Sequence, residues 1–268
     1  MRLIRHSLFT LSGWVDMFMN RRYKAPENID KDIKIFVFQH FKVDLPTCFD
    51  NRAVYIPIQG GGDDIGALSD VSQPSISEYN LFLNEMTQIY WIGKHYQQLG
   101  DPAYVGFAHY RRCLDWNLES LSPGILFASV IVTRYSVHRF FIAYHGDHWL
   151  NKFMIEFKKV FTEPEYDDIE KFWKSHCLYV ANNFITDRDS FSRYFLFIEK
   201  CLEICIRFLR GNIEQFRSMD KGQRRQFGYI MERMTGYWIW HEKRCGRIKV
   251  ITTRLKCYDI DNGLTSVR

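Results

Sequence analysis

The stretch that decides the fold is Tyr104–Trp116, which reads YVGFAHYRRCLDW. Its first residues are apolar or small, as in a buried strand, and they run directly into His109, Tyr110, Arg111 and Arg112. Arginine is almost never fully buried without a partner. The strand therefore ends either at the surface, where the arginines are solvated, or at a site that receives an anion.

Predicted strands and helices alternate on both sides of this stretch. Strands are expected at residues 34–39, 54–59, 103–108, 129–133, 178–185 and 247–252, and helices at 77–100, 139–161, 167–175, 190–209 and 225–243. This alternation predicts an α/β domain with a central mixed, mostly parallel sheet and helices on both faces. Ligands bind beyond the carboxyl ends of the strands in such sheets, so the loops after residues 59, 108 and 185 are the expected site.

The composition favours a globular protein in a reducing compartment. The chain has 268 residues, of which 46% are hydrophobic, so it can bury a large core. Its net charge of +5 permits an anionic partner, but the basic residues do not cluster as a nucleic-acid-binding element requires, so no nucleic acid is expected. Seven cysteines without a CxxC pair predict free thiols rather than disulfides or zinc ligands.

Residues 1–30 are expected to form an amphipathic helical extension with basic ends. No apolar run approaches the length of a membrane span, and Asp16 interrupts the one stretch that could suggest a signal peptide. The apolar residues recur instead at helical spacing. This helix either packs on its own domain or lies on an anionic membrane surface. We expect a cytoplasmic location, with peripheral contact with the inner face of the membrane as one alternative.

Five motifs, in a fixed order, resemble a known family. They are YIPIQ at 55–59, NEMTQIYW at 84–91, YVGFAHYRR at 104–112, NFI at 183–185 and RQFGYIMER at 225–233. The order is similar to that of a family of glycosyltransferase-like proteins from bacterial capsule, exopolysaccharide and lipopolysaccharide gene clusters. That family's hallmark is Glu-Leu-Thr-x-x-Tyr-Trp followed by His-Tyr-Arg-Arg, and here Met86 replaces the leucine. The chain departs from the family's Asp-x-Gly-Asp-Asn-Ile-Ser stretch over 62–77.

The resemblance implies a transferase with a GT-A-like fold over residues 31–268. Its donor would be a nucleotide-diphospho-sugar, and its acceptor a surface glycan or a lipid-linked glycan. The departing diphosphate gains negative charge, which many such enzymes stabilise with a metal on Asp-x-Asp. Here the strand end carries Arg111 and Arg112 instead. We therefore expect a metal-independent enzyme in which one of these arginines binds the diphosphate. No cofactor is expected, although a divalent metal remains an alternative.

The expected catalytic residues are Glu85, Glu232 and His109. Both glutamates lie among apolar neighbours on predicted helices, where burial would raise a carboxyl pKa and suit a general base. Each glutamate has an alternative structural role, because Glu232 could pair with Arg225 or Arg233, and Glu85 with Arg111.

In addition to Arg111 and Arg112, six residues are expected to bind substrate: His40, Asp63, Asp64, Tyr110, Asn183 and Arg225. His40 follows the first strand and could contact the nucleoside, or could simply be a partly exposed strand end. The aspartate pair follows a glycine run, so the backbone there can approach a ligand closely.

Other acidic and histidine motifs carry weaker signals. Asp187 and Asp189 spell Asp-x-Asp but sit where a helix begins, which favours an N-cap role. His145 and His148 lack a third metal ligand at suitable spacing, so no metal site is expected. Cys201 and Cys205 are one helical turn apart on an apolar face and are expected in the core.

One alternative function stays open at this point. A non-catalytic nucleotide- or carbohydrate-binding module of a polysaccharide assembly system would show the same motifs. Such a module would bind nucleoside diphosphates without turning over a donor.

Overall fold

The computed structural model describes residues 32–40, 45–49, 51, 54–61, 68–259 and 264–267. The predicted N-terminal helix and the predicted pair Asp63 and Asp64 lie outside these residues.

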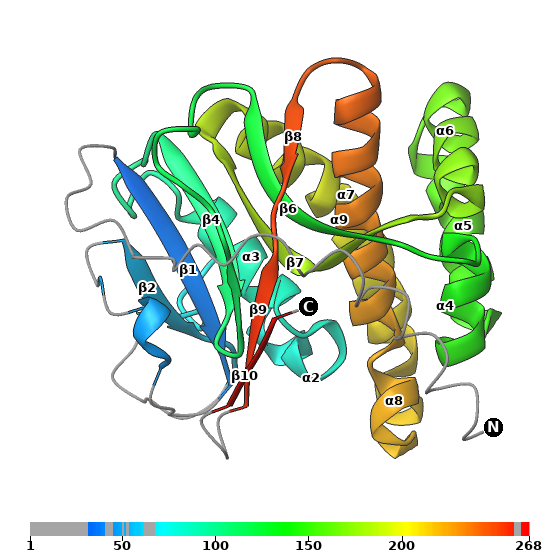
Figure 1. The fold of residues 1–268 in the computed structure, drawn as a ribbon. Helices are drawn as coiled ribbons and strands as arrows, with labels where there is room; N and C mark the ends of the chain where they lie inside the picture. The colour runs from blue at the N-terminus through cyan, green and yellow to red at the C-terminus, as the bar shows by residue number, and fades with distance from the viewer. Residues whose placement is uncertain are drawn as a thin grey trace.

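The described strands form one mixed sheet (Figure 1). Its strands are β1 (Ile33–Gln39), β2 (Tyr55–Gln59), β3 (Leu68–Ser69), β4 (Tyr104–His109), β5 (Arg112–Leu114), β6 (Ile125–Val132), β7 (Cys177–Asp187), β8 (Lys249–Thr252), β9 (Leu255–Asp259) and β10 (Leu264–Val267). Along one path the order is β10-β9-β5-β4-β1-β2-β3, and β7, β6 and β8 follow from β4 on a second path.

The parallel part of the sheet is β3-β2-β1-β4. Its register places Val37 of β1 beside Ala108 of β4, so β1, β2 and β4 end at one edge, which we call the carboxyl edge. The other described pairings are antiparallel except that of β6 with β8. The predicted mixed sheet is confirmed, with a smaller parallel share than expected.

Strand β7 corrects one part of the predicted site. It runs antiparallel to β4, with Asp187 opposite Tyr104, so its carboxyl end lies at the edge away from His109. The loop after Ile185 is therefore not part of the carboxyl edge. Asp187 accepts a hydrogen bond from the backbone N–H of Ser190 at 3.0 Å, which confirms its predicted N-cap role.

The helices are interrupted where the backbone leaves the helical region. They are α2 (Asn80–Leu83), α3 (Met86–Lys94), α4 (Val137–His145), α5 (His148–Val160), α6 (Glu163–Lys174), α7 (Arg188–Ser218), α8 (Lys221–Arg224) and α9 (Gln226–Arg244), with 3₁₀ turns η1 (Thr47–Phe49) and η2 (Ser77–Tyr79). The single helix predicted for 77–100 breaks at Asn84, where φ is 55°. The helix predicted for 139–161 breaks at Gly146, where φ is 75°. Helix α7 passes Gly211 with a kink at Asn212.

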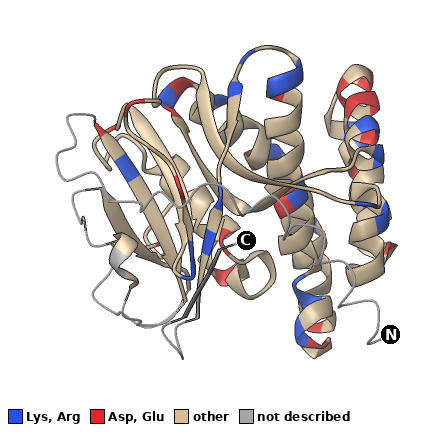
Figure 2. Ribbon diagram, in the orientation of Figure 1, with Lys and Arg blue, Asp and Glu red and all other residues tan. Residues whose placement is uncertain are grey.

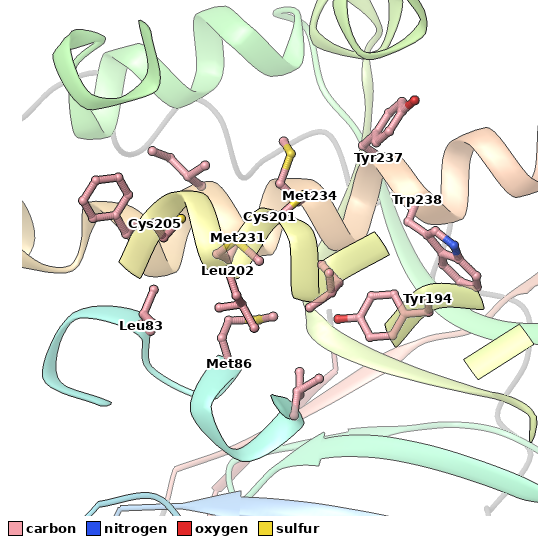
Figure 3. Packing of buried hydrophobic residues seen from close by; sticks show 14 of the residues in the cluster. Leu83, Met86, Tyr194, Cys201, Leu202, Cys205, Met231, Met234, Tyr237 and Trp238 are labelled. Carbon is pink, nitrogen blue, oxygen red and sulfur yellow. The ribbon is translucent and has the colours of Figure 1, made fainter. Parts of the chain in front are cut away.

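Helices α3, α7 and α9 cover one face of the sheet and build the larger core (Figure 1). Figure 3 shows the centre of this core, where residues of α7 and α9 meet Leu83 and Met86. Cys201 and Cys205 lie fully buried in it, as predicted. All seven cysteines are free thiols.

The opposite face of the sheet has its own, smaller core. Ile35 and Val37 of β1 point into it together with Phe49, Trp116 and Leu121. Among the described residues of this core, Cys48 and Phe49 come from the 3₁₀ turn η1, and the others lie on strands or on the segments that join them.

Candidate functional site

The His-Tyr-Arg-Arg motif forms a tight turn at the carboxyl edge. Strand β4 ends at His109, which pairs with Arg112 at the start of β5, so Tyr110 and Arg111 are the two turn residues. The Tyr110 N–H donates to the Phe38 carbonyl of β1 at 3.0 Å, which fixes the turn to the neighbouring strand. Arg111 is exposed with its guanidinium 5.0 Å from the Tyr110 ring centre, and Arg112 is half-buried. Both cations stand at the surface of this edge.

His109 is held as a neutral hydrogen-bonding group. It is buried, and its Nδ1 accepts a hydrogen bond from the Arg111 backbone N–H at 3.3 Å. Burial, followed by the charges of Arg112 and Arg111, lowers the pKa of His109 to about 2. Because Nδ1 accepts, the ring proton sits on Nε2, which makes His109 a donor there. This tautomer argues against His109 as a general base.

His40 lies beside His109 at the end of β1. The two ring centres are 6.3 Å apart. Burial lowers the pKa of His40, and the charges of Arg225 and Arg111 lower it further. Both histidines are thus kept uncharged in a region where guanidinium groups supply the positive charge.

The sheet forks where β4 ends. Strand β7 pairs with β4 as far as Phe107, and β5 takes its place beside His109. The β7 residues at this fork are Asn182, whose backbone has a φ of 51°, and Asn183. Both are buried, and neither the Asn182 Oδ1 nor either polar atom of Asn183 has a hydrogen-bond partner. Buried amides without partners are costly to maintain.

Helix α9 brings a third arginine to this region. Its first turn packs against the break between α2 and α3, and the Arg225 Nε donates a hydrogen bond to the Asn84 Oδ1. A Cβ on Gly228 would lie 2.1 Å from the Asn84 Nδ2, so only glycine permits this approach. The break at Asn84 thus holds Arg225 in place and starts α3 at Glu85 and Met86.

Glu85 and Glu232 lie near enough to one another to interact electrostatically. Burial raises the pKa of the Glu85 carboxyl above its usual value, and the charge of Glu232 adds to this while Arg225 and Arg112 oppose it. The Glu232 Oε1 lies 3.3 Å from the Arg233 Nη1. The carboxyl edge therefore combines two carboxyl groups with three arginines, and Figure 2 shows blue and red segments at this lower end of the sheet.

Residues 34–243 match the family described as "Domain of unknown function (DUF4422)". The match spans more than half of the chain. The chain belongs to the DUF4422 family.

The fold of this DUF4422 chain is shared with a solved structure. The apo structure of the bifunctional glycosyltransferase WbbM superposes with a TM-score of 0.61 at 22% sequence identity. The match covers 84% of this chain and 45% of that chain, so this chain spans less than half of the neighbour's length. At this identity the likeness establishes the fold, which confirms the predicted GT-A-like α/β architecture. No curated protein matches the sequence.

Most site residues predicted from the DUF4422 sequence converge on the carboxyl edge. His40, His109 and Tyr110 lie in direct or near contact there, and Arg111, Arg112, Arg225, Glu85 and Glu232 surround them. Asn183 lies opposite the end of β4. Asp63 and Asp64 fall outside the described residues, and their predicted role stays a prediction.

Sequence reasoning missed two polar residues of this region, Asn84 and Asn182, and gave Arg233 only as a possible partner of Glu232. Asn84 lies inside an otherwise regular helical pattern, and only its tolerance of positive φ could have signalled the break. Asn182 has the same property within a strand. Arg233 is read from the sequence as a partner of Glu232, and its burial depends on packing that the sequence does not disclose.

No metal centre is visible in the described part of this DUF4422 chain. Among these residues, no three His, Cys, Asp or Glu side chains gather as ligands. His145 stacks on Tyr229 with ring centres 4.0 Å apart, whereas His148 contacts Trp149, so the two histidines do not face a common ion. None of the described helices is both long and apolar enough to cross a membrane.

Proposed function

We propose that the protein transfers a sugar, of the hexosyl type, from a nucleotide-diphospho-sugar to a hydroxyl group of a glycan. The observation that supports this most directly is the grouping of Arg111, Arg112 and Arg225 at the carboxyl edge of a GT-A-like sheet. Ligands of open α/β sheets bind at this edge. Guanidinium groups match phosphate oxygens with forked hydrogen bonds, so a diphosphate is the ligand class that fits.

In the proposed reaction the leaving group carries the charge that the arginines stabilise. The bond between the anomeric carbon and the donor's phosphate oxygen breaks, and the electron pair leaves with the nucleoside diphosphate. The acceptor oxygen forms the new bond to the anomeric carbon and loses its proton. Arg111, Arg112 and Arg225 hold the diphosphate, and the Nε2–H of His109 adds a neutral donor.

Glu232 is the carboxylate proposed to interact with the acceptor hydroxyl. It is paired with Arg233 at 3.3 Å, which keeps a fixed cation beside its negative charge. Glu85, whose pKa is raised by burial, is the second carboxyl group proposed to act on the acceptor hydroxyl. If the anomeric centre is inverted, Glu232 takes the acceptor proton.

The cellular setting is proposed from the motifs in the sequence. These motifs resemble those of proteins encoded in capsule, exopolysaccharide and lipopolysaccharide gene clusters. The acceptor would then be a surface polysaccharide or a lipid-linked glycan at the inner face of the cytoplasmic membrane. Residues 1–30 would supply the peripheral membrane contact, which fractionation of the protein with and without this segment would test.

We further propose that the reaction needs no divalent metal, because three guanidinium groups already supply positive charge to the diphosphate. The test is nucleoside diphosphate release from a panel of nucleotide-sugars, with and without EDTA. Activity should persist in EDTA, whereas its loss and rescue by Mn²⁺ would refute metal independence.

The arginines themselves can be tested in the same assay. We expect Arg112→Gln and Arg225→Gln each to lower the turnover by roughly 10²-fold, as for the loss of one charge-stabilising donor. Arg217→Gln, an exposed arginine of α7, is the matched control and should change nothing. Full activity in both site variants would refute the proposed diphosphate site.

The alternative, a non-catalytic binding module, makes a different prediction in these experiments. A module would bind nucleoside diphosphates in calorimetry, and this binding would fall in Arg112→Gln. It would release no nucleoside diphosphate from any donor in the panel.

A further inference from the structure

Arg233 is a buried cation, and two of its guanidinium nitrogens have no hydrogen-bond partner. It is 5% exposed, and neither its Nε nor its Nη1 has a hydrogen-bond partner. The Nη1 lies 3.3 Å from the Glu232 Oε1, which is within ion-pair distance but outside hydrogen-bond geometry. A buried guanidinium with unfilled N–H groups is costly to maintain. Oxygen atoms of a bound ligand would complete its hydrogen bonds.

One member of an aromatic pair, Tyr229, lies one helical turn before Arg233. Tyr229 of α9 stacks on His145 at the end of α4, with ring centres 4.0 Å apart and an interplanar angle of 21°. Both residues are half-buried. The charge of Arg233 also reaches His145, where it adds to burial in lowering the pKa to about 4. Tyr229, His145, Glu232 and Arg233 are therefore close neighbours, and His145 is uncharged near neutral pH.

The spacing along α9 separates this group from the proposed diphosphate site. Arg225 and Arg233 are eight residues apart, which corresponds to about 12 Å along a helix. Glu232 lies between the two regions, since its charge acts on both Glu85 and His145. In the proposed site, the transferred sugar would lie within this interval, between the diphosphate and the second group.

We propose that Tyr229, Glu232 and Arg233, with His145, form an acceptor subsite that binds one pyranose ring of a glycan. The proposal rests on the proposed transferase function and names the part of the site that holds the acceptor. An aromatic face suits the C–H face of a sugar. The Arg233 N–H groups and the Glu232 carboxylate, side by side, suit a pair of neighbouring hydroxyl groups, one donating and one accepting. The hydroxyl that accepts the transferred sugar would be the one that donates to Glu232.

The test is sugar binding by saturation-transfer NMR, with methyl glycosides of glucose, galactose, mannose and N-acetylglucosamine as probes. We expect the wild-type protein to transfer saturation to the ring protons of at least one probe. In Tyr229→Leu, which keeps the apolar volume but removes the aromatic face, the signal should fall at least five-fold. Tyr229→Phe should retain the signal. Arg233→Lys keeps the positive charge but loses the planar set of N–H donors, so it should lower the signal.

Tyr144→Leu is the matched control, because Tyr144 is an exposed tyrosine of α4 that neighbours His145 in sequence. It should leave the signal unchanged. Circular dichroism of each variant confirms that it is folded. The proposal is overturned if no probe gives a signal with the wild-type protein, or if Tyr229→Leu and Arg233→Lys both keep it.

Calorimetry with UDP, GDP, CDP and dTDP on the same samples separates this proposal from the proposed function. Loss of sugar contact with intact nucleotide binding in Tyr229→Leu supports the subsite. Sugar contact without any nucleotide binding in the wild-type protein would refute the donor site and leave the subsite standing. Nucleotide binding without any sugar contact would refute the subsite alone.

Discussion

At the scale of single residues, His109 shows how a buried ring can make folding sensitive to acid. Its pKa is lowered to about 2 in the folded protein, against about 6.5 in an unfolded chain. Between these values the unfolded chain binds one more proton than the folded protein. The free energy of unfolding therefore falls as the pH falls below 6.5.

We expect His109→Gln to reduce this acid sensitivity. A difference of one proton corresponds to about 1.4 kcal/mol per pH unit, which the variant should remove from the slope between pH 4 and 6. Urea unfolding at pH 4.5, 5.5 and 7 measures it. His148→Gln, at an exposed position, is the control and should leave the slope unchanged. Equal slopes for His109→Gln and the wild-type protein would contradict the prediction.

Much of the site was predictable at this scale, because its members are chemically unusual for their places in the sequence. Arginines at the end of a buried strand and glutamates on apolar helices stand out without a structure. Asn182 and Arg233 do not stand out, since what distinguishes them is that some of their polar atoms have no hydrogen-bond partner in the fold. An unfilled hydrogen bond is a property of the folded chain, and the sequence carries no signal for it.

At the scale of elements, the contact between α9 and the α2–α3 break determines where Arg225 lies. Gly228→Ala would place a Cβ 2.1 Å from the Asn84 Nδ2 and 3.1 Å from the Phe82 carbonyl oxygen. The gain in helix propensity, about 1 kcal/mol, is opposed by an overpacking cost of about 1–3 kcal/mol. We expect a lower melting temperature and weaker nucleotide binding, measured by calorimetry.

Gly236→Ala provides a control in the same helix. Its Cβ would be 3.4 Å from the nearest atom, a Phe172 ring carbon, which requires little adjustment. This variant should keep nucleotide binding and should be as stable as the wild-type protein or slightly more so. Similar losses in both variants would mean that the approach at Gly228 has no special role.

The bounds of the elements were predicted well where the apolar periodicity extends over many residues. They were predicted poorly where a single residue takes the backbone out of the helical region. Strands β1, β2 and β4 and helix α9 lie within a residue or two of their predicted bounds. The breaks at Asn84 and Gly146 were missed because the apolar spacing continues across them. Strands β3, β5, β9 and β10 were missed because short strands depend on partners distant in the sequence.

At the scale of the whole molecule, the two cores share the strands between them and should unfold together. Strand β1 sends Phe36 and Phe38 into the larger core and Ile35 and Val37 into the smaller one. Loss of either core therefore exposes strands that the other core needs. One cooperative transition is expected for the described domain.

Leu121→Ala tests this cooperativity. Leu121 is 1% exposed in the smaller core, away from the helices, so the substitution should cost about 2–5 kcal/mol. Helix melting, followed by far-UV circular dichroism, should shift to lower temperature by several degrees in a single step. Leu150→Ala, on α5 in the larger core, should give the same form of curve. A second transition in Leu121→Ala that leaves the helices unaffected would contradict the prediction.

The class of the fold followed from the alternation of strands and helices, but the direction of β7 did not. A strand's composition is the same whether it runs parallel or antiparallel to its neighbour. The position of its carboxyl end, and hence the loops that share the site, is decided only by the pairing of Tyr104 with Asp187.

Arg225 is the N-cap of α9 and Arg233 lies about two turns into the helix, so α9 fixes the distance between the proposed diphosphate site and the proposed acceptor subsite. An inserted residue between them would rotate the second contact by about 100° relative to the first. Hybrid proteins that combine the specificities of two relatives should therefore exchange this helix whole, because cutting within it would put the two halves out of phase.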